Sequence, residues 1–583
     1  MMIKQYRMLL RAFALILLMG GMAVTAAAQS VKGIVKDASG EPMMGVSVVV
    51  KNTSNGTVTG IDGRFQLNVK NKNAVLVFSF LGYTKLERPV PAAGEMTVEM
   101  TEDNTSLNEV VVVGYQEVRK RDLTGSVAKP NMGDLLSTPV GSFDQTLGGR
   151  IAGVNVNSSE GMPGASMNIV IRGNNSLTQD NSPLYVIDGF PVEDPSAGAM
   201  VNPSDIASID ILKDASATAI YGARGANGVV IITTKSGREG KAKITYDGSV
   251  GWQNVTRTIP MMDAYEFVKL QNELFPEKMK DTYLAHYGGK QWTLDDYRNI
   301  AQYNWQDMIF RTAATQNHNL SVTGGNASAR YNASLSYYDQ DGVVLNSNYN
   351  RLQGRLGTTI TRNKLKINLN VNYSRSVQTG ASPSQQSYSG MNNLFYSVWG
   401  YRPVTQPDKP LSSLLDNLVD ETVNLTSDYR FNPIMSLNNE YRKNYANYLQ
   451  FNGYVDYSLA KGLRFKVSGG YTIDFRHNDT FNNSKTRYGG PISIEKVNAQ
   501  IVHSERRTWL NENTLTYQTN IKKTHFFNSM LGFSLQNSDY EEYLMKTIQI
   551  PNESLGMAGM SQGLPGRNES YQSSWAMMSY LQL

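Results

Sequence analysis

The chain has 583 residues, with 55 Lys or Arg, 50 Asp or Glu, five His and no Cys, and a formal net charge of +5. The lack of Cys excludes disulfides, thiol nucleophiles and iron–sulfur clusters, and five scattered His leave little to build a zinc site, so we expect no metal and no cofactor. Lys4, Arg7 and Arg11 lie in a segment expected to be removed, which leaves +2, and no basic face of the kind that binds nucleic acid stands out.

Residues 1–28 have the pattern of a secretory signal peptide. Basic residues precede an unbroken apolar run over Ala12–Met19, and the small residues Ala26–Ala28 precede Gln29. The alternative is a membrane anchor, for which the apolar stretch is short and interrupted by Gly. No later window reaches about 18 consecutive apolar residues, so an exported chain of this kind can span a membrane only as a closed β-barrel.

Short alternating segments and Gly-rich turns predict a small β-sandwich over residues 29–100. Val46–Val50 is a strand, and the continuous apolar segment Val75–Phe80 is of the kind that is buried on both faces. Asp37 and Asp62 lie in turns, where a single carboxylate usually forms the turn, with metal binding as the alternative.

Residues 101–117 form a polar linker that contains a strongly β-prone segment. Glu109 leads into four valines, Val110, Val111, Val112 and Val113. The residues alone leave two interpretations, an ordinary core strand or an extended peptide that adds itself to the edge of a partner's sheet. β-Propensity by itself favours the core strand.

Residues 118–237 predict a mixed α/β domain. Asp214 is placed to cap a short helix over Ala215–Tyr221, which Gly222 ends. Val229–Thr234 follows as a strand without a polar face.

Gly222, Gly225 and Gly228 recur at every third residue of this domain. Neither the dinucleotide-binding nor the Walker spacing is met, so a phosphate loop is disfavoured. We expect these glycines to let a tight turn pack closely against its surroundings.

Residues 238–583 predict long strands that alternate apolar and polar side chains. One example has its apolar residues at Leu365, Ile367, Leu369, Val371 and Tyr373. Such strands, of about ten residues or more, suit a tilted membrane crossing between lipid and a wet lumen. About ten of them can be placed before the chain ends.

The predicted connections between these strands alternate in length. Short turns are expected near 324–326, 362–364, 460–462 and 521–523, and long connections near 253–314, 378–444, 477–504 and 539–570, with a shorter exception near 342–348. Long loops on one rim and short turns on the other are typical of an outer-membrane barrel, and a soluble β-sandwich is the alternative.

Three motifs make the chain resemble a SusC/RagA-type TonB-dependent outer-membrane protein. They are LNEVVVVGY at Leu107–Tyr115, KRDLTGSV at Lys120–Val127 and LKDASATAIYGARGANGV at Leu212–Val229. The resemblance implies a mainly β protein with a signal peptide (1–28), a carboxypeptidase-regulatory-like β-sandwich (29–100), a linker (101–117), an α/β plug domain (118–237) and part of a transmembrane antiparallel β-barrel (238–583). Plugged transporters have about 22 strands, so the chain is expected to be the N-terminal portion of a longer protein.

The resemblance also implies a function and partners. Glu109–Val113 lies where the family places its TonB box. The resemblance therefore favours an extended partner-binding peptide over a core strand. This segment is the expected contact with the energy-transducing protein TonB. The implied activity is active import of a bulky nutrient, foremost an oligosaccharide, across the outer membrane of a Gram-negative bacterium. The implied partners are TonB, a SusD-like surface lipoprotein and outer-membrane lipid.

Two other functions are considered. The first is an outer-membrane receptor that senses a ligand without importing it. The second is a surface enzyme, which is not expected because no Ser-His-Asp, paired-carboxylate or metal constellation stands out. Trp292, Trp305 and Tyr401 in the long loops are expected to stack on sugars, to pack the loops or to contact the lipoprotein, so no substrate-binding residue is assigned.

Overall fold

The computed structural model divides the chain into two compact units, Met1–Thr124 and Gly125–Leu583. The predicted signal peptide lies outside the described residues. Those are 29–37, 40–51, 53, 55–69, 74–80, 83, 85–91, 95–100, 110–113, 116–119, 127–136, 140–158, 161–178, 180–192, 200–214, 218–380, 394–419, 430–521 and 525–582.

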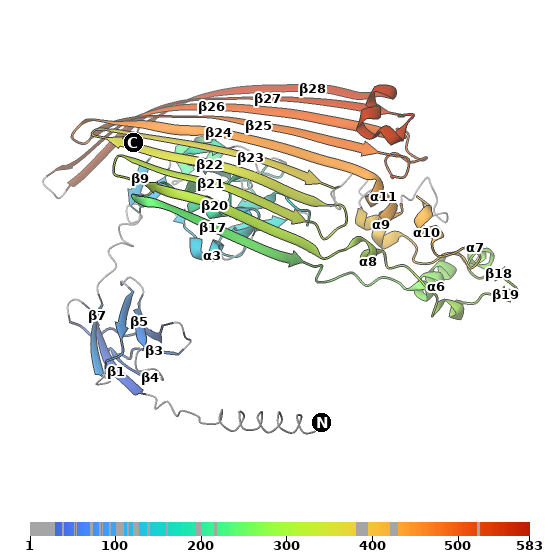
Figure 1. The fold of residues 1–583 in the computed structure, drawn as a ribbon, viewed down its shortest axis with the longest axis horizontal. Helices are drawn as coiled ribbons and strands as arrows, with labels where there is room; N and C mark the ends of the chain where they lie inside the picture. Colours follow the sequence, from blue (N-terminus) through green and yellow to red (C-terminus); the bar gives the residue numbers. More distant parts are fainter. Residues whose placement is uncertain are drawn as a thin grey trace, which may run out of the picture. The chain divides into compact units, whose positions relative to one another are not determined.

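The first unit contains a β-sandwich, as predicted (Figure 1). Its strands are β1 (Gln29–Asp37), β2 (Ser47–Val50), β3 (Gly56–Val58), β4 (Arg64–Val69), β5 (Val75–Ser79), β6 (Leu86–Pro89) and β7 (Glu95–Met100). They form one sheet of order β4-β1-β7 and a second of order β3-β2-β5-β6. Alternate apolar residues of both sheets, such as Val31, Val48 and Leu76, are fully buried and form the core.

The prediction that Val75–Phe80 is buried on both faces is wrong. Leu76 and Phe78 are fully buried, but Val75 and Val77 are half-buried and Phe80 is 36% exposed. Each sheet of this small sandwich has the other sheet on one side only, so a strand buries every second residue.

The second unit begins with the predicted α/β plug domain. Its elements are β10 (Val127–Ala128), α3 (Met132–Leu136), α4 (Phe143–Leu147), β11 (Val154–Ser158), β12 (Met167–Ile171), β13 (Leu184–Ile187), β14 (Phe190–Val192), η3 (Pro203–Asp205), β15 (Ile206–Leu212), η4 (Ala219–Gly225) and β16 (Val229–Thr234). The main sheet has the order β10-β15-β16-β13-β14. The central strand β16 is buried over nearly its whole length, as its uninterrupted apolar sequence predicts.

The helix predicted over Ala215–Tyr221 has the wrong extent. Residues 215–217 lie outside the described residues, and η4 runs on to Gly225. Gly222 interrupts η4 with φ 60° and ψ −145°, so this residue kinks the helix where it was expected to end it. The Asp214 carboxylate pairs with Arg172 of the plug.

The expected close packing is confirmed at Gly225 and Gly228 but not at Gly222, where an added Cβ would meet no atom within 4 Å. A Cβ at Gly225 would lie 2.8 Å from the Thr218 carbonyl oxygen. Gly228 has a φ of +90°, and a Cβ there would lie 2.7 Å from Cδ1 of Ile171. Both positions therefore require the smallest residue.

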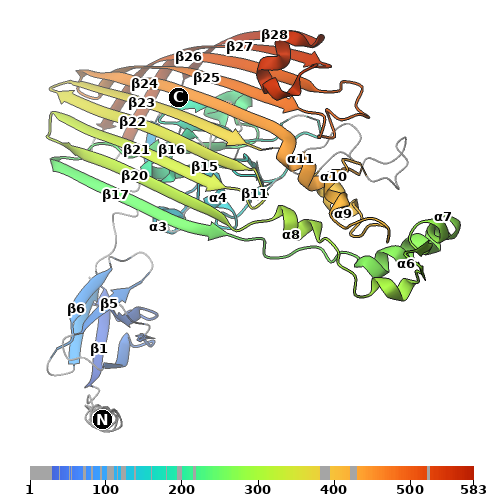
Figure 2. The ribbon, with the colours of Figure 1, turned by 45° about the vertical axis from the view of Figure 1, so that its right-hand side comes forward.

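The rest of the second unit is dominated by one large antiparallel sheet (Figures 1 and 2). Its ten strands, in chain order and in spatial order, are β17 (Gly240–Gln253), β20 (Ala313–Gly325), β21 (Ala329–Asp341), β22 (Asn348–Arg362), β23 (Leu365–Thr379), β24 (Glu440–Ala460), β25 (Leu463–Asn482), β26 (Asn498–Ile521), β27 (His525–Ile548) and β28 (Leu564–Gln582). Their lengths run from 13 residues in β20 to 24 in β26. The predicted partial barrel of about ten strands is confirmed.

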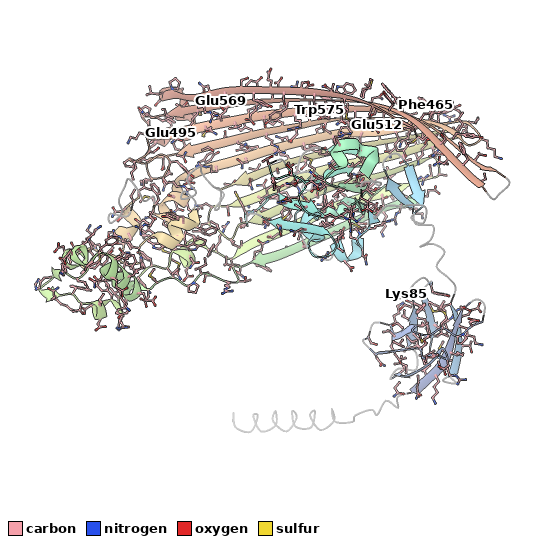
Figure 3. The ribbon with its side chains drawn as sticks, turned by 180° about the vertical axis from the view of Figure 1, so that it is seen from behind. Lys85, Phe465, Glu495, Glu512, Glu569 and Trp575 are labelled. Atoms are coloured by element: carbon pink, nitrogen blue, oxygen red, sulfur yellow. The ribbon has the colours of Figure 1, made fainter. Side chains whose placement is uncertain are left out.

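The two faces of this sheet differ, as the alternation predicts. Apolar side chains such as Leu369, Phe451 and Val455 are exposed on the outer face. On the inner face, polar side chains such as Gln353 and Gln450 are buried. Figure 3, drawn from the side opposite to Figure 1, shows the plug domain in front of this inner face.

The long connections all leave the same rim of the sheet. They contain α6 (Ala264–Leu274), α7 (Pro276–Asp281), β18 (His286–Tyr287), β19 (Lys290–Gln291), η5 (Leu294–Tyr297), α8 (Trp305–Ile309), α9 (Leu394–Gly400), α10 (Ser413–Asp416), α11 (Pro433–Asn439) and η6 (Glu553–Gln562). No helix among the described residues is long and apolar enough to cross a membrane.

Two of the predicted long connections are shorter than expected. Strands β25 and β26 reach Asn482 and Asn498, so the connection between them is 483–497, where 477–504 was predicted. Strands β27 and β28 likewise reduce the predicted 539–570 to 549–563. In both cases the backbone pairing of neighbouring strands continues beyond the predicted strand ends, from Asn482↔Asn498 and from Ala499↔Thr547.

Candidate functional site

The predicted partner-binding segment is extended in the structure. Glu109 lies outside the described residues, and Val110, Val111, Val112 and Val113 form β8 (Val110–Val113). This strand pairs antiparallel with β9 (Gln116–Arg119) in a two-stranded sheet of its own. A two-stranded ribbon is only marginally stable by itself in water.

Polar side chains of the large sheet hold the plug through its backbone. Arg351 Nη2 donates to the Gly141 carbonyl oxygen over 2.7 Å. Gln353 Nε2 and Asn372 Nδ2 both donate to the Met200 carbonyl oxygen, over 2.6 and 2.9 Å. Water can replace such hydrogen bonds when the two surfaces separate, so this interface is less costly to open than an apolar one.

Carboxylates of the plug also contact the sheet. Ser334 Oγ donates to Asp205 Oδ2 over 2.7 Å, and both residues are buried. Burial raises the pKa of Asp205 above its ordinary value, and the hydrogen bond from Ser334 opposes this change. The Ser334 hydroxyl thus stabilises the ionised carboxylate of Asp205 across the plug–sheet contact.

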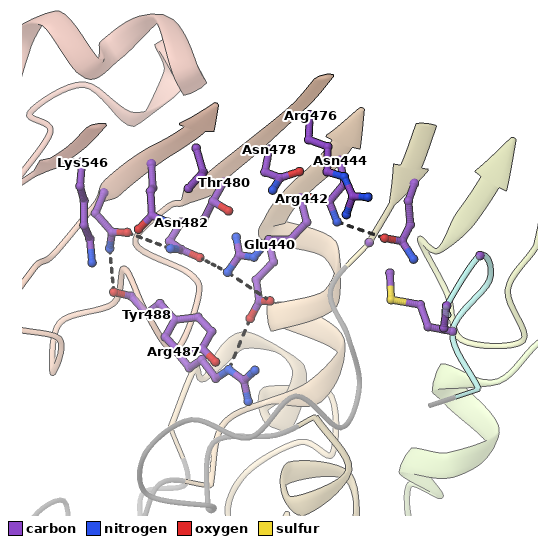
Figure 4. Close-up of a pocket in the computed structure, with 18 of the residues that line it drawn as sticks. Glu440, Arg442, Asn444, Arg476, Asn478, Thr480, Asn482, Arg487, Tyr488 and Lys546 are labelled. Atoms are coloured by element: carbon purple, nitrogen blue, oxygen red, sulfur yellow. Dashed lines mark hydrogen bonds and ion pairs between the residues drawn. The ribbon is translucent and has the colours of Figure 1, made fainter. Parts of the chain in front are cut away.

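A polar cavity of about 740 Å³ lies between the plug and the loop-side ends of the sheet strands (Figure 4). The plug contributes the segment around Gly164. The sheet and its long connections contribute Gln378, Gly380, Glu440, Arg442, Asn444, Arg476, Asn478, Thr480, Asn482, Arg487, Tyr488, Glu495, Asn498, Gln500, Val502 and Lys546.

Hydrogen bonds fix part of the cavity wall before any ligand enters. Arg442 Nη2 donates to Asn482 Oδ1 over 2.8 Å, and Asn482 Nδ2 donates to Asn498 Oδ1 over 2.8 Å. Asn498 Nδ2 then donates to the Tyr488 carbonyl oxygen over 2.9 Å. A wall held in this way loses little conformational entropy when it binds a ligand.

The cavity combines charged groups with amides. Lys546 Nζ lies 2.5 Å from Glu495 Oε1, and Arg476 Nη2 lies 2.9 Å from Asp474 Oδ2. The amides of its Asn and Gln side chains present both donors and acceptors. This composition suits a hydrophilic ligand with many hydroxyl groups.

None of these cavity residues was assigned from the sequence. A signal was present: Arg476, Asn478 and Thr480 alternate along β25, with the period of an inner strand face, next to a long connection. Their meeting with residues of β24, β26 and β27 depends on the register of the sheet, which single strands do not reveal.

The aromatic residues considered in the long loops pack those loops. Trp305 and Tyr401 are each 3% exposed, with ring centroids 5.2 Å apart. Trp305 Nε1 also donates to the Arg402 carbonyl oxygen over 3.0 Å. The half-buried Trp292 lies against Tyr297. Packing is the interpretation that these contacts support.

The two carboxylates weighed as metal ligands stabilise turns. Asp37 Oδ1 accepts a hydrogen bond from the Glu41 amide over 2.9 Å, and Asp62 Oδ1 accepts one from the Arg64 amide over 3.2 Å. Across the described part of the chain, no group of three or more acidic, His or Cys side chains is arranged to hold a metal ion.

Comparison with protein families identifies two domains in the chain. Residues 31–112 match the CarboxypepD_reg-like domain, and residues 119–229 match the TonB-dependent Receptor Plug Domain.

Comparison with individual proteins extends the similarity to most of the chain. The chain is 40% identical over 366 residues to the TonB-dependent receptor SusC of Bacteroides thetaiotaomicron, and the aligned region covers 60% of this chain and 35% of that receptor. It is 32% identical over 544 residues to the TonB-dependent receptor P3 of Formosa agariphila, which covers 92% of this chain and 50% of that receptor. The chain thus spans about a third to a half of the length of these relatives.

A solved structure is similar as well. The RagAB peptide importer in its open-open state matches with a TM-score of 0.68 and 25% identity, over 81% of this chain and 54% of that one. Its closed-closed state matches with a TM-score of 0.64 and 26% identity, over 79% and 53%.

Proposed function

Because the chain belongs to the SusC/RagA-type TonB-dependent receptors, we propose that it takes part in the active import of a bulky nutrient, foremost an oligosaccharide, across the outer membrane. The observation that carries this proposal is the polar cavity that the plug and the sheet enclose together. A ligand held between these two parts is released on the far side only if the plug moves, so binding and passage are linked by the geometry.

The polar plug–sheet interface supports a plug that can move. Its contacts include hydrogen bonds from Arg351 and Gln353 to plug carbonyl oxygens, which water replaces when the plug is displaced. A pulling force on the plug therefore has to break these hydrogen bonds together with the buried ion pair between Arg355 and Asp188.

We further propose that Glu109–Val113 is where TonB grips the protein. The extended conformation of Val110–Val113 and its pairing in a marginal two-stranded ribbon support this role. Exchanging β9 for a strand of TonB keeps the backbone hydrogen bonds of β8 and gives a grip that resists pulling along the strand.

The remaining partners and segments are proposed on the same basis. A surface lipoprotein of the SusD type would bind at the loop-bearing rim, where residues Ala264–Tyr297 share an apolar core with Val404 of another connection. Residues 1–28 would direct export, 29–100 would form the accessory sandwich, 101–117 the linker, 118–237 the plug and 238–583 the outer-membrane wall.

Deletion of Glu109–Val113 from the full-length protein in its native host tests the proposal. Uptake of the nutrient on which growth depends should fall to the level of cells that lack the gene, because TonB then has no strand to grip. Deletion of Thr101–Thr105, five other residues of the predicted linker, is the matched control and should leave uptake intact, with surface levels of both variants measured. Uptake that persists without Glu109–Val113 would overturn the proposal, and a lost transcriptional response with intact uptake would point to sensing.

A further inference from the structure

The charges that line the polar cavity are not balanced. The positive side chains are those of Arg442, Arg476, Arg487 and Lys546, and the negative ones are those of Glu440 and Glu495. Four positive against two negative charges leave a difference of +2 within this lining. Counting Asp474, which pairs with Arg476 from outside the lining, leaves +1. A cavity with low-dielectric walls concentrates the field of such an excess.

The excess is located where two guanidinium groups share one carboxylate. Arg442 Nη2 lies 3.8 Å from Glu440 Oε2, and Arg487 Nε lies 3.7 Å from Glu440 Oε1. Both distances are longer than a hydrogen bond. Arg487 Nε is buried and makes no hydrogen bond to any described residue. Glu440 thus offsets one of the two charges. Arg442 Nη1 already donates to the carbonyl oxygens of Tyr441 and Phe481, over 2.9 and 3.4 Å, so any unused donor capacity of Arg442 belongs to the rest of its guanidinium group.

An aromatic ring holds both guanidinium groups in place. The ring centroid of Tyr488 lies 4.5 Å from Cζ of Arg487 and 5.7 Å from Cζ of Arg442. Arg442 is also anchored by its hydrogen bond to Asn482. Fixed, planar guanidinium groups recognise a carboxylate better than flexible cations do, because their donors are already oriented.

The rest of the lining favours a sugar over a peptide. Asn444, Asn478, Thr480 and Gln500 offer the paired donors and acceptors that hydroxyl groups need. Among the cavity residues, Val502 and Met162 are the only large aliphatic side chains. Apolar peptide side chains would therefore find little surface to bury here.

We propose that this cavity binds oligosaccharides that carry a carboxylate, such as those containing uronic acids, with the carboxylate near Arg442 and the hydroxyl groups on the amides. This inference rests on the proposed import function and narrows its substrate class. The excess positive charge favours a ligand that carries a carboxylate, and the amides of the wall favour a ligand with many hydroxyl groups.

The experiment compares one pool of sugars before and after its charge is removed. Oligosaccharides from partial hydrolysis of several uronic-acid-containing polysaccharides are incubated with the purified full-length protein, and the retained sugars are identified by mass spectrometry. The same pool, with its carboxyl groups chemically reduced to alcohols, is the matched neutral probe. Acidic oligosaccharides should be retained at least tenfold more than their reduced counterparts. Equal retention, preference for the reduced pool or no retention of either would overturn the inference.

Two variants with opposite expected effects on retention distinguish a change in ligand binding from misfolding, because misfolding would lower retention in both. Arg442→Gln should reduce retention of the acidic pool about tenfold, and Glu440→Gln should increase it several-fold because it removes the competing carboxylate. Arg507→Gln is the charge-matched control, since Arg507 is half-exposed on β26 and pairs with Glu505 away from the cavity. Changes in the same direction for Arg442→Gln and Glu440→Gln would contradict the inference.

A pool of acidic peptides is tested in parallel. Preferential retention of those peptides would assign the positive charge to a peptide ligand and overturn the sugar assignment. The two proposals can fail separately. If deletion of Glu109–Val113 abolishes uptake but acidic and neutral sugars are retained equally, the import function is supported and only the preference for acidic sugars is refuted.

Discussion

Arg355 of the large sheet and Asp188 of the plug form an ion pair across the plug–sheet interface, with Nη2 3.4 Å from Oδ2. Their side chains are 6% and 14% exposed. Asp188 also accepts hydrogen bonds from the amide and the hydroxyl of Thr234, over 2.9 and 2.6 Å. The pair therefore joins a plug turn, a plug strand and the sheet at one buried point.

Removing Arg355 should loosen the plug. Arg355→Met keeps the length of the side chain but leaves Asp188 without its cation, and loss of one partner of a buried pair typically costs about 3 kcal/mol. We expect faster hydrogen exchange, measured by mass spectrometry, in plug residues 184–192. The control is Arg330→Met, because Arg330 Nη1 lies 3.9 Å from the exposed Glu239 and such surface pairs contribute below about 1 kcal/mol. Equal exchange in the two variants would contradict this prediction.

The buried carboxyl of Asp144 should make plug stability depend on pH. Burial raises its pKa to about 7, and hydrogen bonds from Ser142 and Tyr185 oppose the shift. The folded plug binds this proton more tightly than the unfolded chain does, so the contribution of Asp144 to the free energy of unfolding is greatest at low pH. This contribution should fall by roughly 4 kcal/mol as the pH rises from about 4 to about 7.

The Asp144→Asn variant tests this dependence. It removes the titrating group, so its plug stability should be nearly constant over the same pH range. The measurement is urea-induced opening of the plug, which is monitored through the hydrogen exchange of residues 143–147 and corrected for the intrinsic exchange rate. The same pH slope in the variant and the parent would show that another group is responsible.

The close approach at Gly228 should make its replacement destabilising. Gly228→Ala places a Cβ 2.7 Å from Ile171 in a backbone conformation with φ +90°, which should destabilise the plug by about 1–3 kcal/mol. Gly251→Ala in β17 is the control, because a Cβ there meets no atom within 4 Å. The urea midpoint for plug opening should fall in the first variant only, and an unchanged midpoint would refute the packing argument.

Tying the plug to the sheet should block import. The chain has no Cys, so a pair introduced at Asp205 and Ser334, whose side chains are hydrogen-bonded across the interface, can be joined by a short thiol-reactive cross-linker. Import should fall at least tenfold on cross-linking, relative to the same variant left untreated. Cysteines at Thr508 and Ser538, which are hydrogen-bonded within the sheet, form the matched control pair. Import that survives the plug–sheet cross-link would rule out plug movement as a requirement.

The order of the strands and most of their turns were predictable because their signals are local. Leu365 to Tyr373 alternate with polar residues, and a two-residue side-chain period is a property of one strand alone. The turn at Asn363, with a φ of 53°, follows from the residue type that tolerates this conformation. The end of β25 and the start of β26 were predicted wrongly, because the backbone pairing between the two strands continues to Asn482 and Asn498, and pairing between strands is not visible in either strand alone.

The sandwich, the plug, the ten-stranded sheet and the family could be predicted from the amino-acid sequence, since each depends on short periodic patterns or on contiguous motifs. Which side chains meet became known only from the folded chain. Glu440, Arg487 and Lys546 line one cavity because the register of the four strands β24 to β27 and the folding of the connection 483–497 bring them together. Arg355 meets Asp188 across 167 positions of sequence, where the hydrophobic pattern carries no information about pairing. The lining of the cavity depends on such distant contacts, because a cavity is formed between elements and belongs to none of them alone.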